Sequence, residues 1–108
     1  MPKPTTSQLK IDVRDSPGYC KNIKTYPKAI ADVQNVLDNV VIPALRANPV
    51  APYQEGPITP IVKGIYAVRV PDSSGGKGKR GGFRLQFHWN RHTGQLTKLS
   101  LAIRRDLN

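Results

Sequence analysis

Three basic side chains on two nearby segments have residue types and spacing suited to holding phosphate groups. Arg69 lies in the segment 64–70, and Arg84 and His88 lie in the segment 83–89. In both segments large apolar residues alternate with polar ones, the period-two pattern of a half-buried strand. If the two strands pair as a hairpin, the three side chains share its solvated face. The pattern predicts a surface that binds a polyanion.

The predicted loop between these two strands is rich in glycine and in positive charge. Its cationic residues are Lys77, Lys79 and Arg80, set among five glycines. One interpretation is a flexible loop that clamps RNA phosphates, and the alternative is a solvated hairpin tip whose charges only aid solubility. The nearby Arg69 and Arg84 favour RNA binding. The loop is not a Walker loop, because no Gly-Lys-Ser or Gly-Lys-Thr sequence opens a helix here.

The charge of the chain is strongly positive and unevenly distributed. The formal net charge is +10 over 108 residues. Residues 60–108 hold ten Lys and Arg residues against two acidic residues, whereas residues 1–59 hold seven against five. A basic half of this kind indicates a partner such as nucleic acid, an acidic protein or an anionic membrane surface. The alternative is a basic protein whose charge serves only solubility.

The cysteine and histidine content argues against disulfides and metal sites. Cys20 is the one cysteine, and we expect it to pack as a small hydrophobe in a helix. Two scattered histidines and one cysteine do not form a metal-ligand set, so no metal or cofactor is expected. The N-terminal residues have no apolar signal sequence, and no apolar run approaches the roughly 18 residues of a membrane span. The sequence therefore predicts a cytoplasmic protein without a membrane partner.

The hydrophobic pattern predicts one α+β domain over residues 1–108. After a disordered segment 1–7, the expected elements are a strand at 8–14, a helix at 17–25 capped by Asp15 or Ser16, a longer helix from about 28 to 47, an irregular segment at 48–63, and strands at 64–70, 83–89 and 96–103. Pro43 either kinks the longer helix or makes it end and restart. This β-α-α-β-β-β order predicts two helices packed on one face of a small, twisted, mostly antiparallel four-stranded sheet.

The strand patterns also predict which side chains face the core. Tyr66, Phe83, Phe87 and Trp89 share the apolar face, so core packing is favoured over a base-stacking role. In the last strand Leu99, Leu101 and Ile103 alternate with Lys98, Ser100 and Ala102. Lys98 is therefore expected on the polar face as an RNA-binding residue. His92, in the turn that Thr93-Gly94 reverses, is a second candidate RNA contact.

Four segments together resemble the RelE/ParE superfamily of toxins from bacterial type II toxin–antitoxin modules. They are the strand 64–70, the loop 78–82, the Phe83-Arg84-Leu85 sequence and the terminal Arg104-Arg105-Asp106. The family pattern is an aromatic-led basic strand, a loop, a Gly-aromatic-Arg strand and a closing strand that ends in a basic pair and an acid. The long glycine-rich basic loop is similar to HigB-like members, and the resemblance covers nearly the whole chain.

The resemblance implies a toxin that cleaves messenger RNA on the ribosome and is neutralised by a cognate antitoxin. It further implies a metal-independent endoribonuclease in which the ribose 2′-OH attacks the adjacent phosphate and leaves a cyclic phosphate. Arg69, Arg84 and Arg105 match the family's basic positions. Simple alternation places Arg105 with the apolar residues of the last strand and Arg104 with the polar ones, so either arginine can be the functional one.

The sequence departs from the RelE pattern at two positions that matter for proton transfer. Ala67 stands where RelE has a lysine, and the sequence ends at Asn108, before the helix that carries a catalytic tyrosine in RelE. His88 and His92 are candidates to supply the missing general acid or base. Two alternatives remain open: a ParE-like toxin that inhibits DNA gyrase, and a noncatalytic or degenerate basic RNA-binding module.

Overall fold

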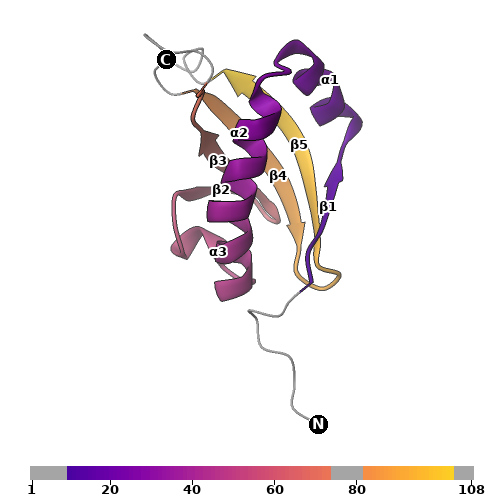
Figure 1. The fold of residues 1–108 in the computed structure, drawn as a ribbon. Helices are drawn as coiled ribbons and strands as arrows, with labels where there is room; N and C mark the ends of the chain where they lie inside the picture. The colour runs from indigo at the N-terminus through magenta and orange to yellow at the C-terminus, as the bar shows by residue number, and fades with distance from the viewer. Residues whose placement is uncertain (1–9, 74–81, 104–108) are drawn as a thin grey trace.

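The chain folds into a mixed five-stranded sheet with helices covering one face, as Figure 1 shows. The structure, a computed structural model, describes residues 10–73 and 82–103. The strands are β1 (Asp12–Asp15), β2 (Ile58–Val62), β3 (Ile65–Val70), β4 (Phe83–Asn90) and β5 (Gln95–Ile103), and their order in the sheet is β1-β5-β4-β3-β2. β1 runs parallel to β5, and the other neighbours are antiparallel.

The predicted α+β class is confirmed, and the predicted four-stranded sheet is wrong. The additional strand is β2, which lies in the segment 48–63 that we expected to be irregular. Its prolines argue against a central strand, but β2 is an edge strand that pairs only with β3. The Trp89 N–H donates to the Gly64 carbonyl, and from this bond onward the backbone groups of β3 point alternately to β4 and to β2. In this pattern the backbone nitrogen of Pro60 points away from β3. The missing N–H of Pro60 therefore breaks no ladder bond.

The helix α1 (Pro17–Thr25) has the bounds that the sequence predicts, and Ser16 is its N-cap. The Ser16 side chain accepts a hydrogen bond from the Tyr19 N–H, which satisfies one of the free donors at the helix start. Gly18 allows α1 to approach the sheet, since a Cβ there would lie 2.9 Å from the Leu99 carbonyl oxygen. Tyr19 is buried against the sheet, whereas Cys20 is exposed, so the expectation that Cys20 packs in the core is wrong.

α1 also covers the part of β5 that β1 does not reach. β1 pairs with β5 only as far as Asp15 opposite Lys98. Beyond that point the Ser16 hydroxyl donates to the Leu99 carbonyl, and the Asn22 side chain accepts from the Leu101 N–H, at 3.1 and 3.0 Å. The side chains of this helix therefore close the edge of β5 where the sheet has no further strand.

Pro43 neither kinks the long helix sharply nor ends it. α2 (Ala29–Val36) passes into a π-helical turn, η2 (Leu37–Val41), and then into α3 (Ile42–Ala47). The Ile42 N–H donates to the Leu37 carbonyl, five residues back. In a regular α-helix the Pro43 ring would clash with the carbonyl of Asn39, and the wider π turn gives that carbonyl more room. The rod continues across the front of the sheet in Figure 1.

The core lies between this rod and one face of the sheet. The predicted strand alternation is confirmed in β4, where every second residue is buried. The buried residues that fill this layer are Val33, Val36, Leu37, Val41, Ala44 and Leu45 from the rod and Tyr66, Val68, Val70, Phe83, Leu85, Phe87, Trp89, Leu96 and Leu101 from the sheet. At the start of the rod Ala29 is buried, whereas the larger Ile30 is 55% exposed.

We predict that Gly94→Ala destabilises the fold, whereas Gly56→Ala does not. Gly94 has φ +75°, and a Cβ there would collide with the carbonyl oxygen of Lys10, two residues before β1. Alanine is strained at such a φ, so the free energy of unfolding should fall by more than about 1 kcal/mol. Gly56 has no atom within 4 Å of the same position, which makes it the matched control. Urea unfolding measures both variants, and equal midpoints would contradict the assignment.

Candidate nucleic-acid interface

The face of the sheet opposite the helices carries mostly polar side chains. We call it the open face, and it is formed by the residues that alternate with the core positions: Asp12 and Arg14 in β1, Gln95, Thr97, Ser100 and Ala102 in β5, Arg84, Gln86, His88 and Asn90 in β4, Ile65, Ala67 and Arg69 in β3, and Thr59 and Val62 in β2. The Arg69, Arg84 and His88 side chains lie on this one face, as the sequence predicts.

Arg69 and Arg84 lie directly opposite each other across β3 and β4. Gly64 and Trp89 form a hydrogen-bonded pair, and along an antiparallel ladder such pairs alternate with non-hydrogen-bonded ones. Five pairs further along, Arg69 and Arg84 therefore form a non-hydrogen-bonded pair. Side chains approach most closely at such pairs, where the Cα atoms are about 4.5 Å apart. The fold thus places two arginines, fifteen residues apart in sequence, side by side on one face.

This arginine pair has no neutralising carboxylate within the described residues. The ion pairs there join Arg14 to Asp12 and Lys98 to Asp15, and neither includes Arg69 or Arg84. Like charges directly opposite each other in a sheet are destabilising. An anion that bridges the two guanidinium groups would remove this repulsion and accept hydrogen bonds from both. The arrangement is suited to a phosphate oxygen cluster.

His88 lies on the open face but away from the arginine pair. It is four residues from Arg84 along β4, which corresponds to about 13 Å. Its imidazole Nε2 lies 3.2 Å from the position that a Cβ of Gly64 would occupy. Gly64 has φ +80° and belongs to the turn between β2 and β3, so its missing side chain leaves room for the ring. The structure therefore does not bring His88 together with Arg69 and Arg84.

His92 is also remote from the arginine pair. It is exposed in the turn that joins β4 to β5, eight residues beyond Arg84. Its backbone N–H donates to the Asn90 side-chain oxygen at 3.0 Å. The turn, which Gly94 completes with a positive φ, is as the sequence predicts.

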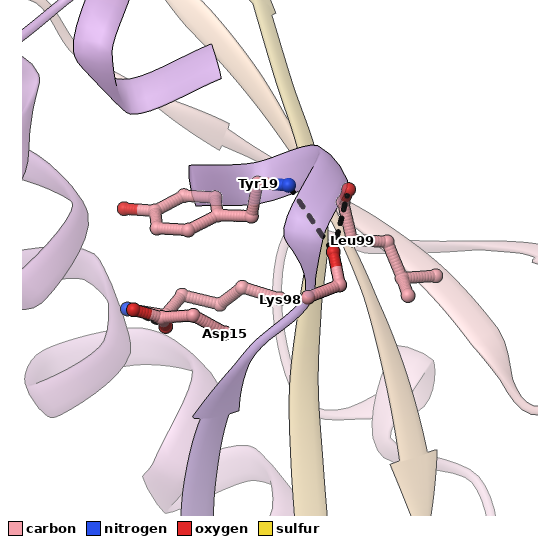
Figure 2. Close-up of polar contacts among 5 residues, drawn as sticks. Asp15, Tyr19, Lys98 and Leu99 are labelled. Atoms are coloured by element: carbon pink, nitrogen blue, oxygen red, sulfur yellow. Dashed lines mark hydrogen bonds and ion pairs between the residues drawn. The ribbon is translucent and has the colours of Figure 1, made fainter. Parts of the chain in front are cut away.

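The prediction that Lys98 lies on the polar face is wrong. Its ammonium is 3.0 Å from an Asp15 carboxylate oxygen and 4.6 Å from the ring centroid of Tyr19, and its side chain is only 11% exposed. Figure 2 shows the Lys98 side chain extending past the Tyr19 ring toward Asp15. Lys98 therefore joins β5 to β1 and α1 on the covered side, and we leave it out of the candidate interface.

A register shift between β4 and β5 accounts for this reversal. Ser100 pairs with Gln86, but Lys98 pairs with Phe87, so that one residue of β5, Leu99, has no opposite partner. An inserted residue of this kind turns every residue on one side of it to the other face. Strict alternation along the last strand does not anticipate this.

Five predicted site residues lie outside the described residues: Lys77, Lys79, Arg80, Arg104 and Arg105. The chain that leads toward the loop is held at Ser73, whose N–H and hydroxyl both donate to the Asp32 carboxylate of α2. This contact attaches Ser73, the last described residue after β3, to the helical layer.

The aromatic residues of the hairpin belong to the core, as predicted. Trp89 is 4% exposed, and its indole N–H donates to the Pro49 carbonyl at 2.9 Å. Tyr66 stacks against Tyr53, and burial, with Tyr53 as a second cause, raises the pKa of its phenol. Neither ring is placed to stack on a base from the open face.

Sequence reasoning missed the polar residues of β1 as part of the same face. Arg14 lies on the open face and pairs with Asp12 at 2.9 Å, with both side chains exposed. Alternation in 8–14 groups these two residues, but only the parallel pairing of β1 with β5 shows that they extend the face that carries Arg84.

Metal and membrane features are not found in the described part of the chain. Residues 10–73 and 82–103 contain no group of three His, Cys, Asp or Glu side chains that could hold a metal ion. Within the same residues, no helix has the length and apolar character of a membrane span.

No protein-family model, curated protein or solved structure matches this chain.

We predict a loss of stability at alkaline pH that depends on Tyr19. Burial, aided by the charge of Asp15, raises the pKa of Tyr19 from 10.0 to about 12. The folded chain then keeps the phenol proton that the unfolded chain releases, so stability is full below pH 10 and falls as the pH rises toward 12. The loss is on the order of 2 kcal/mol.

The Tyr19→Phe variant should lose less stability over the same pH interval, because its ring has no proton to release. Urea unfolding of both chains at several pH values measures the difference, and tyrosines elsewhere contribute equally to both. Parallel pH profiles would contradict a proton held at Tyr19.

Proposed function

We propose that this protein is the toxin of a bacterial type II toxin–antitoxin module and cleaves messenger RNA on the ribosome. The observation that carries the proposal is the pair of directly opposed arginines, Arg69 and Arg84, on the sheet face opposite the described helices. The order of the strands around this pair and the excess of positive charge in residues 60–108 support it. The sequence resemblance to RelE-like and HigB-like toxins adds the substrate class.

In the proposed reaction Arg69 and Arg84 hold the phosphate that is cleaved. The ribose 2′-oxygen forms a new bond to phosphorus, the bond from phosphorus to the 5′-oxygen breaks, and a 2′,3′-cyclic phosphate results. One proton leaves the 2′-OH and one is delivered to the 5′-oxygen. Negative charge on the phosphate oxygens increases in the transition state, and two adjacent guanidinium groups stabilise that charge more than they stabilise the ground state.

Proton transfer is not assigned to His88 in this proposal. The imidazole lies over Gly64, and His88 is four residues along β4 from Arg84, so the proposed phosphate site is built on the arginine pair alone. His88 and His92 instead lie in the same direction from the arginine pair, where the RNA chain on one side of the cleaved bond would pass. Their proposed role is RNA binding.

The proposed partners follow from the same face. Messenger RNA and ribosomal RNA supply phosphates to Arg69 and Arg84, and the cognate antitoxin covers the face with acidic side chains. The placement in the cytoplasm belongs to this proposal, since ribosomes are the site of action.

We predict that Arg84→Ala abolishes growth arrest when the protein is expressed without antitoxin. The variant removes one of two phosphate-binding groups and should weaken RNA binding at least about tenfold. The free energy of unfolding should stay the same or rise, because a repulsion within the sheet is removed. Lys21→Ala, which removes one exposed charge from α1 on the other side of the sheet, is the control and should remain toxic.

Primer extension on cellular RNA separates the proposal from its alternatives. Breaks in register with codons, confined to translated messages and absent in Arg84→Ala, support the proposal. DNA damage signalling without RNA breaks would instead indicate gyrase inhibition. RNA binding with neither effect would indicate a noncatalytic module.

We also predict that His88→Ala retains cleavage. Because the backbone of His88 is about 13 Å along β4 from that of Arg84, loss of the imidazole should reduce RNA affinity a few-fold and leave the pH dependence of the cleavage rate unchanged. Single-turnover cleavage on programmed ribosomes measures both quantities. Loss of one limb of the pH profile would show that His88 does transfer a proton.

A further inference from the structure

The two edges of the sheet differ in whether they can pair with another strand. At the β2 edge, alternation turns the backbone groups of Ile58 and Pro60 outward. The Ile58 N–H already donates to the Gly56 carbonyl at 2.8 Å, and Pro60 has no N–H. This edge presents no free outward N–H between Ile58 and Pro60, so strand addition is disfavoured along this part of β2.

The edge formed by β1 is open. The Asp12 N–H donates to the carbonyl of Gly94, just before β5, and the Ser16 N–H donates to the Lys98 carbonyl of β5. Alternation therefore turns the backbone groups of Val13 and Asp15 away from β5. Within the described residues these groups have no partner, and all four residues of β1 are exposed. β1 forms the right-hand edge of the sheet in Figure 1.

The charges on β1 select the strand that can pair there. Asp12 precedes Val13 and Arg14 follows it, so the order along β1 is acidic, apolar, basic. The Asp12 and Arg14 side chains lie on the open face. If a second copy of β1 pairs antiparallel with Val13 opposite Val13, each Asp12 lies opposite Arg14 of the other copy. These two residues occupy non-hydrogen-bonded positions, where opposite charges approach closely.

Neighbouring registers oppose like charges. A two-fold axis at Arg14 places the two Arg14 side chains opposite each other, and an axis at Asp12 places two carboxylates opposite each other. Charged edge strands usually discourage pairing with an arbitrary strand. Here the same charges are self-complementary in one register, as an isologous interface requires.

We propose that the protein forms a two-fold dimer through β1, with Val13 on the axis and two Asp12–Arg14 pairs across it. In the single chain Asp12 and Arg14 form an ion pair at 2.9 Å. In the dimer these two ion pairs, one within each chain, are replaced by two Asp12–Arg14 pairs between the chains. The Val13 N–H and carbonyl bond their counterparts in the second copy. The two open faces then lie on one side of a continuous sheet. This proposal does not depend on the proposed reaction.

Charge exchange at positions 12 and 14 tests both the dimer and its register. Sedimentation velocity of the full chain should show a concentration-dependent dimer, of twice the 11.9 kDa chain mass, in the micromolar range. Asp12→Arg puts two positive side chains opposite each other, and Arg14→Asp puts two negative ones there. Each variant should dimerise at least about tenfold more weakly than the wild type.

The double variant Asp12→Arg/Arg14→Asp has the wild-type net charge and should recover the dimer. An equimolar mixture of the two single variants should form a heterodimer, because every cross-strand pair is then opposite in charge. Circular dichroism should show all variants folded, since the exposed ion pair contributes little to stability.

A wild-type chain that stays monomeric through the micromolar range would overturn the proposal. A dimer that Asp12→Arg leaves unchanged, or a mixture that forms no heterodimer, would overturn the register. A monomeric chain whose β1 pairs only with a strand of another protein would show that the occupant is not a second copy.

Discussion

Burial of one face of β4 against the helical rod is the constraint on which the rest of the structure depends. β4 is the central strand, and its residues Leu85 and Phe87 are fully buried under the rod. Successive side chains of a strand point to opposite faces, so this burial commits Arg84, Gln86 and His88 to the other face. A shift of one residue would bury the arginine and expose the aromatic rings. The basic face is thus a direct consequence of how the core packs.

The same alternation fails at one residue of β5, and this changes the chemistry of a lysine. The unpaired Leu99 allows Leu96 and Leu101 both to face the core although they are five residues apart. Lys98 is turned under α1, where its ammonium forms an ion pair with Asp15 and a cation–π contact with the Tyr19 ring. Arg69 and Arg84 have no such partners in the described ranges. Two kinds of basic residue result: one that holds the fold together, and a pair available to bind an anion.

Backbone alternation determines which N–H and carbonyl groups point outward at the sheet edges, just as side-chain alternation determines the two faces. Pro60 and the Gly56–Ile58 bond close β2, and Ser16 and Asn22 of α1 close the uncovered part of β5. Pro60, Gly56 and Ser16 are turn or helix-cap residue types that can be recognised in the sequence, whereas Asn22 lies within α1. Among the described edges, β1 keeps outward N–H groups without a partner, at Val13 and Asp15, and its charges complement themselves about Val13. A basic face and an open edge therefore lie on one sheet, and pairing at the edge extends the face.

Hydrophobic periodicity in the sequence determined α1, the long helical segment, the strands β3, β4 and β5 and most of the core, because burial of one stripe or one face imposes its period on the residue types. It also determined that Arg69, Arg84 and His88 share a face. Tertiary structure alone decided that Arg69 lies directly opposite Arg84, that His88 is distant from both, and that Lys98 faces the other way. Those facts depend on pairing register, and a single unpaired residue alters register without changing the local pattern. The strand β2 escaped prediction for a related reason: its proline is acceptable only at a sheet edge, and edges are a property of the assembled sheet.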